Sequence, residues 1–242
     1  MTPFANVVLF SSIAGAATLV GIALVLAAGR WIEKYCGYIV SAAAGFLVAI
    51  AVAHVLPEAL ELNDRSPLWF IVGFVVFFAV EHFITVHACR HTDCDHEGRG
   101  LTAAAGIGVH SLFDGVAIGV GFEVDAALGV LTAAAVILHE LPEGVFTYTI
   151  LINSGADKRR SIVYSVLVAL ATPVGAVLTF VLFRQWVNEA VLGVMLGFIG
   201  GTFIYIGAGD LTPEAHRGRS FVNVAMLALG AVGAIGLGFL AH

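Results

Sequence analysis

Two pairs of ionisable residues have the side-chain types and the spacing of a metal site. His110 lies four positions before Asp114, and His139 lies four positions before Glu143. In a helix, residues at this spacing share one face and lie one turn apart. Imidazole and carboxylate ligands suit Zn²⁺, Fe²⁺ and Mn²⁺ and would be an unusual choice for Na⁺ or K⁺. We therefore interpret the two pairs as a candidate site for a divalent transition-metal cation.

Both pairs lie in strongly apolar sequence. The chain has 242 residues, of which 60% are hydrophobic and only 12% are charged, and its mean hydropathy is +0.98. A soluble domain of this length does not need so much apolar surface for its core. The composition predicts an integral membrane protein, and nothing in it resembles a nucleic-acid-binding surface.

Eight segments are long enough to cross a hydrocarbon core about 30 Å thick, which takes about 20 apolar residues in a helix. They are residues 4–28, 37–56, 67–86, 101–122, 126–152, 162–183, 190–209 and 221–241. The runs are too long for the strands of an outer-membrane barrel and lack their alternation. We expect an all-α membrane protein whose eight transmembrane helices form a single domain over residues 1–242.

The basic residues predict the orientation of these helices. Of the eleven Lys and Arg residues, nine fall in alternate loops and only Arg65 and Arg184 fall on the other side. The positive-inside rule places the nine in the cytoplasm, so both termini face outward from a cell membrane in this multi-pass topology. No basic residue precedes the first segment, which we read as a retained helix and not as a signal peptide.

One predicted cytoplasmic loop, residues 87–100, is rich in side chains that bind metals. Its candidate ligands are His87, His91, Cys94 and His96. By composition they predict weak metal binding, and the alternative is a solvated polar turn.

The acidic residues inside the predicted spans have no Lys or Arg beside them. An unpaired carboxylate in a low-dielectric interior costs several kcal/mol, so its partner must be a proton or an imported cation. His110 and His139 fall near the middle of their segments, which places the candidate site near the membrane midplane. Glu81 and His82 are adjacent and point to different faces, which favours a structural role for them.

Two further groups lie near the ends of predicted helices. His54 and Glu58, near the outer end of 37–56, are candidates for the site where ions enter, although they could equally reach the membrane interface. Asp210, Glu214 and His216, near the inner end of 190–209, are candidates for an exit site.

Short internal echoes, meaning similar motifs at two places in the sequence, indicate a repeat. "HSLFDGV" at 110–116 matches "HELPEGV" at 139–145, and "LPEA" at 56–59 matches "TPEA" at 212–215. Because the helices that carry each pair run in opposite directions, the echoes predict an inverted repeat of helices 1–3 and 6–8 around helices 4–5.

The paired motifs "HSLFDG" and "HELPEG" resemble the signatures of the ZIP (Zrt/Irt-like) metal transporters, and "IYIGAGDLTPEA" is similar to helix seven of that family. The resemblance covers nearly the whole chain. It implies that His110, Asp114, His139 and Glu143 form the primary transport site. Ser111 and Glu140 occupy positions that contribute to a second metal in some members.

The resemblance is imperfect at that second position. Residue 111 is commonly Asn in the family, and Thr172 stands where binuclear members have a bridging Glu. These departures speak against a second metal. The resemblance also implies uptake toward the cytoplasm, often as a dimer, with helices one, four, five and six moving against the others.

A rival interpretation is an intramembrane zinc hydrolase, because "HELPE" places His139 and Glu140 much as zincin motifs place a ligand and a general base. No further histidine set is obvious for an open catalytic site. The sequence therefore favours a transporter and not an enzyme, with zinc, or iron or manganese next, as the transported substrate. An efflux carrier is the third interpretation.

Overall fold

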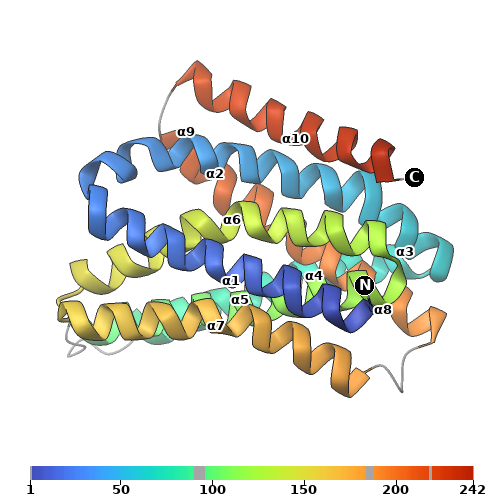
Figure 1. Cartoon of the computed structure of the whole chain (residues 1–242), viewed down its shortest axis with the longest axis horizontal. Helices are drawn as coiled ribbons and strands as arrows, with labels where there is room; N and C mark the ends of the chain where they lie inside the picture. The colour runs from blue at the N-terminus through green and yellow to red at the C-terminus, as the bar shows by residue number, and fades with distance from the viewer. Residues whose placement is uncertain (1, 90–95, 184–187, 218–219, 242) are drawn as a thin grey trace.

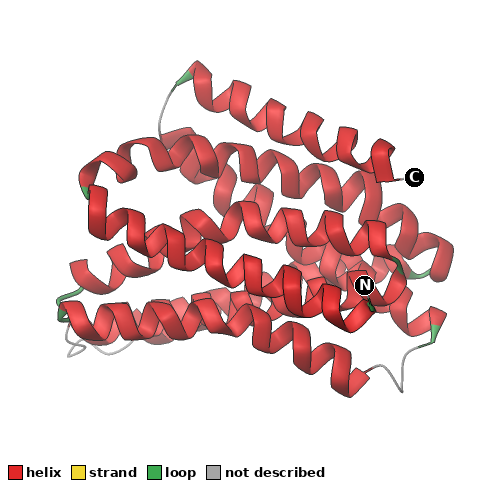
Figure 2. Cartoon of the chain, viewed as in Figure 1, coloured by secondary structure: helices red, strands yellow, loops and turns green. Residues whose placement is uncertain are grey.

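Every regular element of the chain is a helix in the computed structural model, which describes residues 2–89, 96–183, 188–217 and 220–241 (Figure 2). Eight stretches of these residues are long and apolar enough to cross a membrane: Pro3–Ala28, Tyr35–Leu62, Ser66–Phe83, Gly100–Val124, Ala126–Asn153, Lys158–Leu182, Glu189–Leu211 and Phe221–Gly238. They coincide with the eight predicted segments to within a few residues at most ends. The all-α, eight-helix prediction is confirmed.

Two of the eight spans are built from several helical elements. The bounds in chain order are α1 (Pro3–Ala28), α2 (Arg30–Ile50), η1 (Ala51–Val55), α3 (Leu56–Leu62), α4 (Ser66–Cys89), α5 (His96–Val124), α6 (Ala126–Asn153), α7 (Lys158–Phe183), α8 (Glu189–Ile204), η2 (Tyr205–Leu211), α9 (Thr212–Arg217) and α10 (Phe221–Ala241). The second span consists of α2, η1 and α3, and the seventh of α8 and η2, because a π-helical segment interrupts each of them.

The spans lie side by side, and the two chain termini lie at the same end of the bundle (Figure 1). We call this the terminal end. The opposite end, where Gly29 joins α1 to α2 and Ser154–Asp157 join α6 to α7, we call the loop end. Lys158, Arg159 and Arg160 are exposed there, as the predicted cytoplasmic side requires. The orientation in the membrane stays a prediction.

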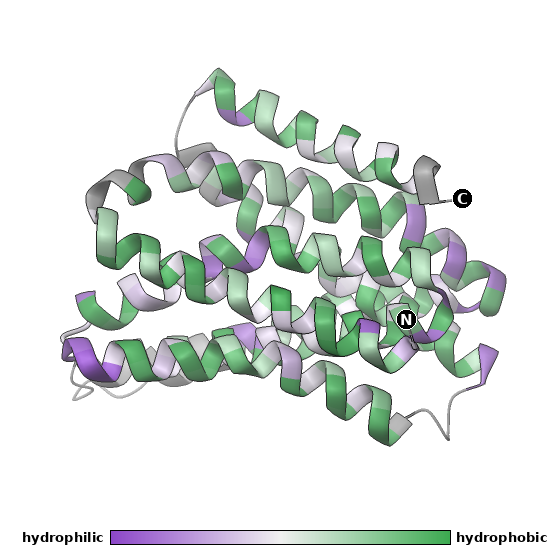
Figure 3. Ribbon diagram, in the orientation of Figure 1, coloured by the Kyte–Doolittle hydropathy of each residue, from purple (hydrophilic) through white to green (hydrophobic). Residues whose placement is uncertain are grey.

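The centre of the bundle is α6, whose most apolar window is 67% buried, whereas the corresponding windows of α4 and α10 are each only 17% buried. The peripheral helices are apolar along most of their length, as the green ribbon of Figure 3 shows. Leu167 on α7 and Leu229 and Val232 on α10 are examples of large exposed aliphatic side chains. Such surfaces suit contact with lipid, and they leave α6 as the helix best shielded from it.

Glycines bring the helices of two pairs into close contact. A Cβ at Gly45 or Gly230 would collide with a carbonyl of the opposite helix where α2 packs on α10, and the same holds for Gly201 and Gly73 where α8 packs on α4. Small residues allow such backbone contact inside a membrane. The two pairs are those that the predicted inverted repeat would exchange, so the packing agrees with the repeat, which stays a prediction.

The two π-helical segments stand in corresponding places. η1 ends directly before the "LPEA" motif and η2 directly before "TPEA". His54 in η1 and Asp210 in η2 each lie two positions before their motif. Since π-bulges inside helices are frequent at functional sites, both segments are of interest for the transport path.

Candidate metal centre

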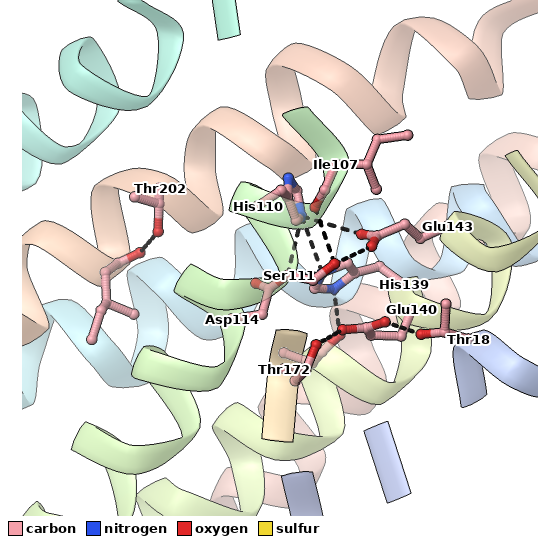
Figure 4. A network of polar contacts seen from close by, with 12 residues as sticks. Thr18, Ile107, His110, Ser111, Asp114, His139, Glu140, Glu143, Thr172 and Thr202 are labelled. Atoms are coloured by element: carbon pink, nitrogen blue, oxygen red, sulfur yellow. Dashed lines mark hydrogen bonds and ion pairs between the residues drawn. The ribbon is translucent and has the colours of Figure 1, made fainter. Parts of the chain in front are cut away.

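Four side chains from two neighbouring helices converge in the middle of the bundle. His110 and Asp114 come from α5, and His139 and Glu143 come from α6. Each offers one nitrogen or oxygen atom, and these four atoms lie within 4.8 Å of one another (Figure 4). We call these residues the four-residue centre. The helical spacing of each pair predicted the shared face, and the packing of α5 on α6 brings the two faces together.

The contacts within the centre are short. The Nε2 atom of His110 lies 3.2 Å from Asp114 Oδ2 and 3.6 Å from Glu143 Oε2, and the Nε2 atom of His139 lies 3.1 Å from Asp114 Oδ2. These charged contacts of both carboxylates are to imidazoles and not to Lys or Arg. Two imidazole nitrogens and two carboxylate oxygens around one point form the kind of ligand set that binds zinc in four-coordinate sites.

His139 is oriented by the backbone of its own helix. Its Nδ1 lies 2.9 Å from the carbonyl oxygen of Ala135. A carbonyl only accepts hydrogen bonds, so Nδ1 carries the proton of this bond and the Nε2 lone pair of a neutral ring faces the centre. Such a partner on the distal nitrogen fixes the tautomer and ring orientation of metal-binding histidines. The side chain is 2% exposed, so the ring has little room to turn away.

Ser111 supports the centre without belonging to the four. Its hydroxyl lies 2.5 Å from Glu143 Oε1 and 3.1 Å from the carbonyl oxygen of Ile107. Donation to Glu143 holds one carboxylate oxygen and leaves the other, Oε2, facing His110. Ser111 thus lies where it orients a candidate ligand.

Glu140 is not one of the four convergent residues, although it follows His139 directly. Its side chain is fully buried, and its two oxygens accept hydrogen bonds from the hydroxyls of Thr18 on α1 and Thr172 on α7 (Figure 4). Adjacent helical residues face different directions. Of the six residues predicted to bind metal at the midplane, the structure therefore brings four together and places Ser111 and Glu140 beside them.

An aromatic ring that the sequence reading missed packs against the centre. Phe77 on α4 lies edge-on to His110, with 5.4 Å between ring centroids and an interplanar angle of 74°. It also contacts Phe113 and Tyr205. Phe77 is one of many phenylalanines in apolar sequence, so no local pattern distinguishes it.

A cavity of about 490 Å³ extends from the centre toward the loop end. Its lining includes His110, His139 and Glu143 at one end and residues near the loop end of their helices at the other, namely Ala103, Gly106, Ile150, Asp210 and Leu211. His110 is accordingly 15% exposed, whereas Asp114 is 2% exposed. The centre is thus reachable from the loop end.

Glu81 and Asp210 share that cavity. Glu81 interacts with both Tyr205 and Asp210, and its Oε2 atom is buried with no hydrogen-bond partner. The sequence favoured a structural role for Glu81, because Glu81 and His82 are adjacent and point to different faces of their helix. The structure instead joins Glu81 to the candidate exit residue Asp210.

Several other predicted metal-binding residues cannot be placed. His91 and Cys94 lie outside the described residues. His87, His96, Glu214 and His216 belong to helical ends whose side chains are also outside the description. Helix α4 ends at Cys89 and helix α5 begins at His96. Only residues 90–95 of the predicted loop therefore lie between the two helices.

A second cavity, of about 320 Å³, lies at the terminal end. It is lined by both residues predicted to receive ions, His54 and Glu58, and by two acidic residues that the sequence reading passed over, Glu61 and Asp125. The Nε2 atom of His54 is buried and has no hydrogen-bond partner. Asp125 also caps α6 by accepting from the backbone amides of residues 127 and 128.

The helix α6 links the two cavities. Leu128 and Leu131 line the cavity at the terminal end, and His139 and Glu143 line the other. The turn between them is closed, because Ala135 and Val136 are fully buried and pack in the main hydrophobic core. The centre is therefore shielded on the side of the terminal end.

Comparison with known proteins agrees with this architecture. A family model described as "ZIP Zinc transporter" matches residues 90–238, which include both motif helices and the seventh and eighth spans. More than half of the chain lies within the match.

Characterised relatives are similar over the same part of the chain. They include the zinc transporter zipt-7.1 of Caenorhabditis briggsae (32% identical over 121 residues, 50% of this chain and 31% of the relative). Human zinc transporter ZIP10 is 29% identical over 143 residues (57% and 17%), and human zinc transporter SLC39A7 is 30% identical over 159 residues (60% and 34%). The chain thus spans about a third or less of the length of these relatives.

Proposed function

Because the chain belongs to the ZIP zinc transporter family, we propose that it carries a divalent transition-metal cation across the membrane toward the cytoplasm, with zinc as the first candidate. The observation that carries this proposal is the four-residue centre of His110, Asp114, His139 and Glu143. The names of the relatives point to zinc, and the same ligand chemistry would accept iron or manganese.

The charge balance of the centre supports a cation as cargo. Asp114 and Glu143 are buried in the middle of membrane spans and have histidine as their charged partner. Ionisable residues within membrane spans usually mark ion pathways. A dication between the two carboxylates would neutralise them, and the imidazoles would complete its coordination without adding charge.

The two cavities suggest a path. In our proposal an ion meets His54 and Glu58 at the terminal end, binds the four-residue centre, and leaves past Glu81 and Asp210. An inside-negative potential would favour this direction by about 2.3 kcal/mol per charge per 100 mV, or about 4.6 kcal/mol for a dication. His87, His91, Cys94 and His96, with Glu214 and His216, would then receive ions on the cytoplasmic side.

Alternating access fits the unequal exposure of the centre. The cavity at the loop end reaches the ligands, whereas buried residues of α6 separate them from the cavity at the terminal end. If the loop end is cytoplasmic, this arrangement corresponds to the inward-open state. The outward-open state would connect His54 and Glu58 with the same four ligands and close the route past Asp210.

An inverted repeat would relate the two routes. His54 and Asp210 occupy equivalent positions before "LPEA" and "TPEA", both in π-helical segments. In repeat-built transporters, exchanging the conformations of the two halves opens one side and closes the other. We infer that the η1 and η2 segments are the equivalent parts of the two halves.

The rival interpretations have less support. The hydrolase interpretation has little support, because the family is one of zinc transporters. In addition Glu140, its proposed general base, accepts hydrogen bonds from two threonine hydroxyls. Efflux differs from uptake only in direction. Metal flux in vesicles of known orientation separates these two.

Uptake of Zn²⁺ into proteoliposomes tests the proposal. We expect saturable uptake by the wild type and its loss in His139→Ala and Asp114→Ala. Matched controls are His82→Ala and Asp64→Ala, which remove exposed residues of the same types. Unchanged saturable uptake in the two centre variants would end the proposal.

A further inference from the structure

Glu140 is the most completely buried acidic residue of the described chain, with 0% exposure. It is not one of the four residues that converge as candidate metal ligands. A carboxyl group kept this far from water needs compensating partners. The role of Glu140 must therefore be sought in the partners that it has.

Those partners come from two other helices. The hydroxyl of Thr18 on α1 donates to one oxygen of Glu140, and the hydroxyl of Thr172 on α7 donates to the other. We call the three residues the Glu140 clasp; it joins α1, α6 and α7 (Figure 4).

The same two threonines lie at close backbone contacts between their own helices and the helices that carry the four-residue centre. A Cβ at Gly144 would collide with the carbonyl oxygen of Thr18, and a Cβ at Gly115 with that of Thr172. Each glycine directly follows a carboxylate of the four-residue centre, Glu143 or Asp114. Each threonine thus touches a glycine beside a candidate ligand through its backbone and Glu140 through its side chain.

We propose that Glu140 is a positioning residue for the metal centre, acting through Thr18 and Thr172 and not by binding the ion itself. The clasp holds α7 against both α5 and α6, and α1 against α6, so the backbone at Asp114 and Glu143 keeps its spacing. This inference rests on the proposed function, because metal affinity is its readout. It also assigns one ion to each chain, since Glu140 is not among the residues whose ligand atoms converge.

The competing role for Glu140 is ligation of a second ion. In that role a lone pair of Glu140 that the threonines leave unused would bind the ion, whereas in the clasp the carboxyl group only accepts from the two threonine hydroxyls. The number of ions bound and the effect of the threonine variants therefore separate the two roles.

The test is a Zn²⁺ titration of the purified full chain in detergent or nanodiscs, with the dissociation constant and the stoichiometry as readouts. The variants are Thr172→Val, Thr18→Val, Glu140→Gln and Glu140→Leu. Val is close to Thr in shape and lacks only the hydroxyl. The control is Thr179→Val, which removes a buried hydroxyl of α7 that donates within its own helix, to the Gly175 carbonyl at 2.8 Å.

We expect one ion per wild-type chain. Thr172→Val and Glu140→Leu should weaken Zn²⁺ binding by about 10- to 100-fold, which is typical when a group that orients a metal ligand is lost. Glu140→Gln should recover part of the affinity, because its carbonyl oxygen still accepts from one threonine. Combining Thr172→Val with Glu140→Leu should add little to the larger single effect, since both remove the same contact.

Three results would overturn the inference: two ions in the wild type and one in Glu140→Gln, a dissociation constant unchanged by Thr172→Val and Thr18→Val, or a lowered melting temperature with unchanged affinity. If Glu140→Leu does not fold, the two valine variants still decide. Failure of the proposed function looks different, because then the wild type neither binds nor transports Zn²⁺, or His139→Ala changes neither.

Discussion

His110 and His139 face each other across the two central helices, with 3.5 Å between their Nε2 atoms. They are twenty-nine residues apart in the chain and occupy the same position in two related motifs. Two imidazole nitrogens so close together compete for one proton or share one cation. Each histidine is followed one helical turn later by a carboxylate, and the two histidines and two carboxylates together form the proposed metal site.

Removing His139 should weaken metal binding most among the four ligands, because its ring is buried and already oriented by Ala135. We expect His139→Ala to weaken Zn²⁺ binding by about 100-fold or more, since loss of a ligand should exceed the 10- to 100-fold cost of losing a group that orients one. Isothermal titration calorimetry measures the change. His82→Ala should leave the affinity unchanged, and equal losses in both variants would contradict this assignment.

Acidification should weaken metal binding. Imidazole must be neutral and a carboxylate ionised to bind a metal, so protons compete for His110, Asp114, His139 and Glu143. Affinity should therefore fall steadily from about pH 8 to about pH 5.5, with proton release on binding. Titrations in buffers of different ionisation enthalpy report both quantities. An isotherm that does not change over this range would refute the prediction.

Ser111 should tune the centre without being essential to it. Its hydroxyl holds Glu143 Oε1 at 2.5 Å, so Ser111→Ala leaves that oxygen free to rotate. We expect Zn²⁺ affinity to fall by about tenfold, the lower end of the range for groups that orient ligands. Ser165→Ala on α7, where the hydroxyl donates only to the Ser161 carbonyl at 2.8 Å, is the control. Complete loss of binding in Ser111→Ala would instead indicate direct ligation.

Glu81 and Asp210 should matter more for release than for binding at the centre. They share the cavity that leads away from His110 and contact each other. Glu81→Gln and Asp210→Asn should each lower the maximal rate of Zn²⁺ uptake by about 10-fold or more, as expected for groups on an ion pathway. The dissociation constant of the centre should change little. Initial rates in proteoliposomes, compared with equilibrium titration, separate the two effects, and a loss confined to affinity would contradict the proposed exit.

The close helix contacts at Gly144 and Gly115, beside the four-residue centre, should leave no room for a side chain at either glycine. Gly144 lies against the Thr18 carbonyl and Gly115 against that of Thr172. Gly144→Ala should destabilise the protein by about 1–3 kcal/mol, the usual cost of overpacking, and lower the melting temperature in detergent. Gly233→Ala, on an open face of α10, should not. Equal melting temperatures for the two variants would argue against the close contact.

The sequence by itself determined the helices, because the length and apolar character of each segment act locally. It also determined which residues could be ligands, since positions four apart share a helical face whatever the helix packs against. The four-residue centre of His110, Asp114, His139 and Glu143 followed from that spacing and from the absence of basic residues in the spans.

Only the tertiary structure decided which faces meet. Glu140 and Ser111 occupy positions that contribute to a second metal in some family members. In this chain the packing of α1 and α7 on α6 places two threonine hydroxyls on Glu140, and the packing of α5 on α6 brings Ser111 to Glu143. Glu81 contacts Asp210 only because α4 packs on α8 and η2 continues the span that α8 begins. Such contacts join residues that are distant in the chain, and they depend on close approach at glycines, which local periodicity does not encode.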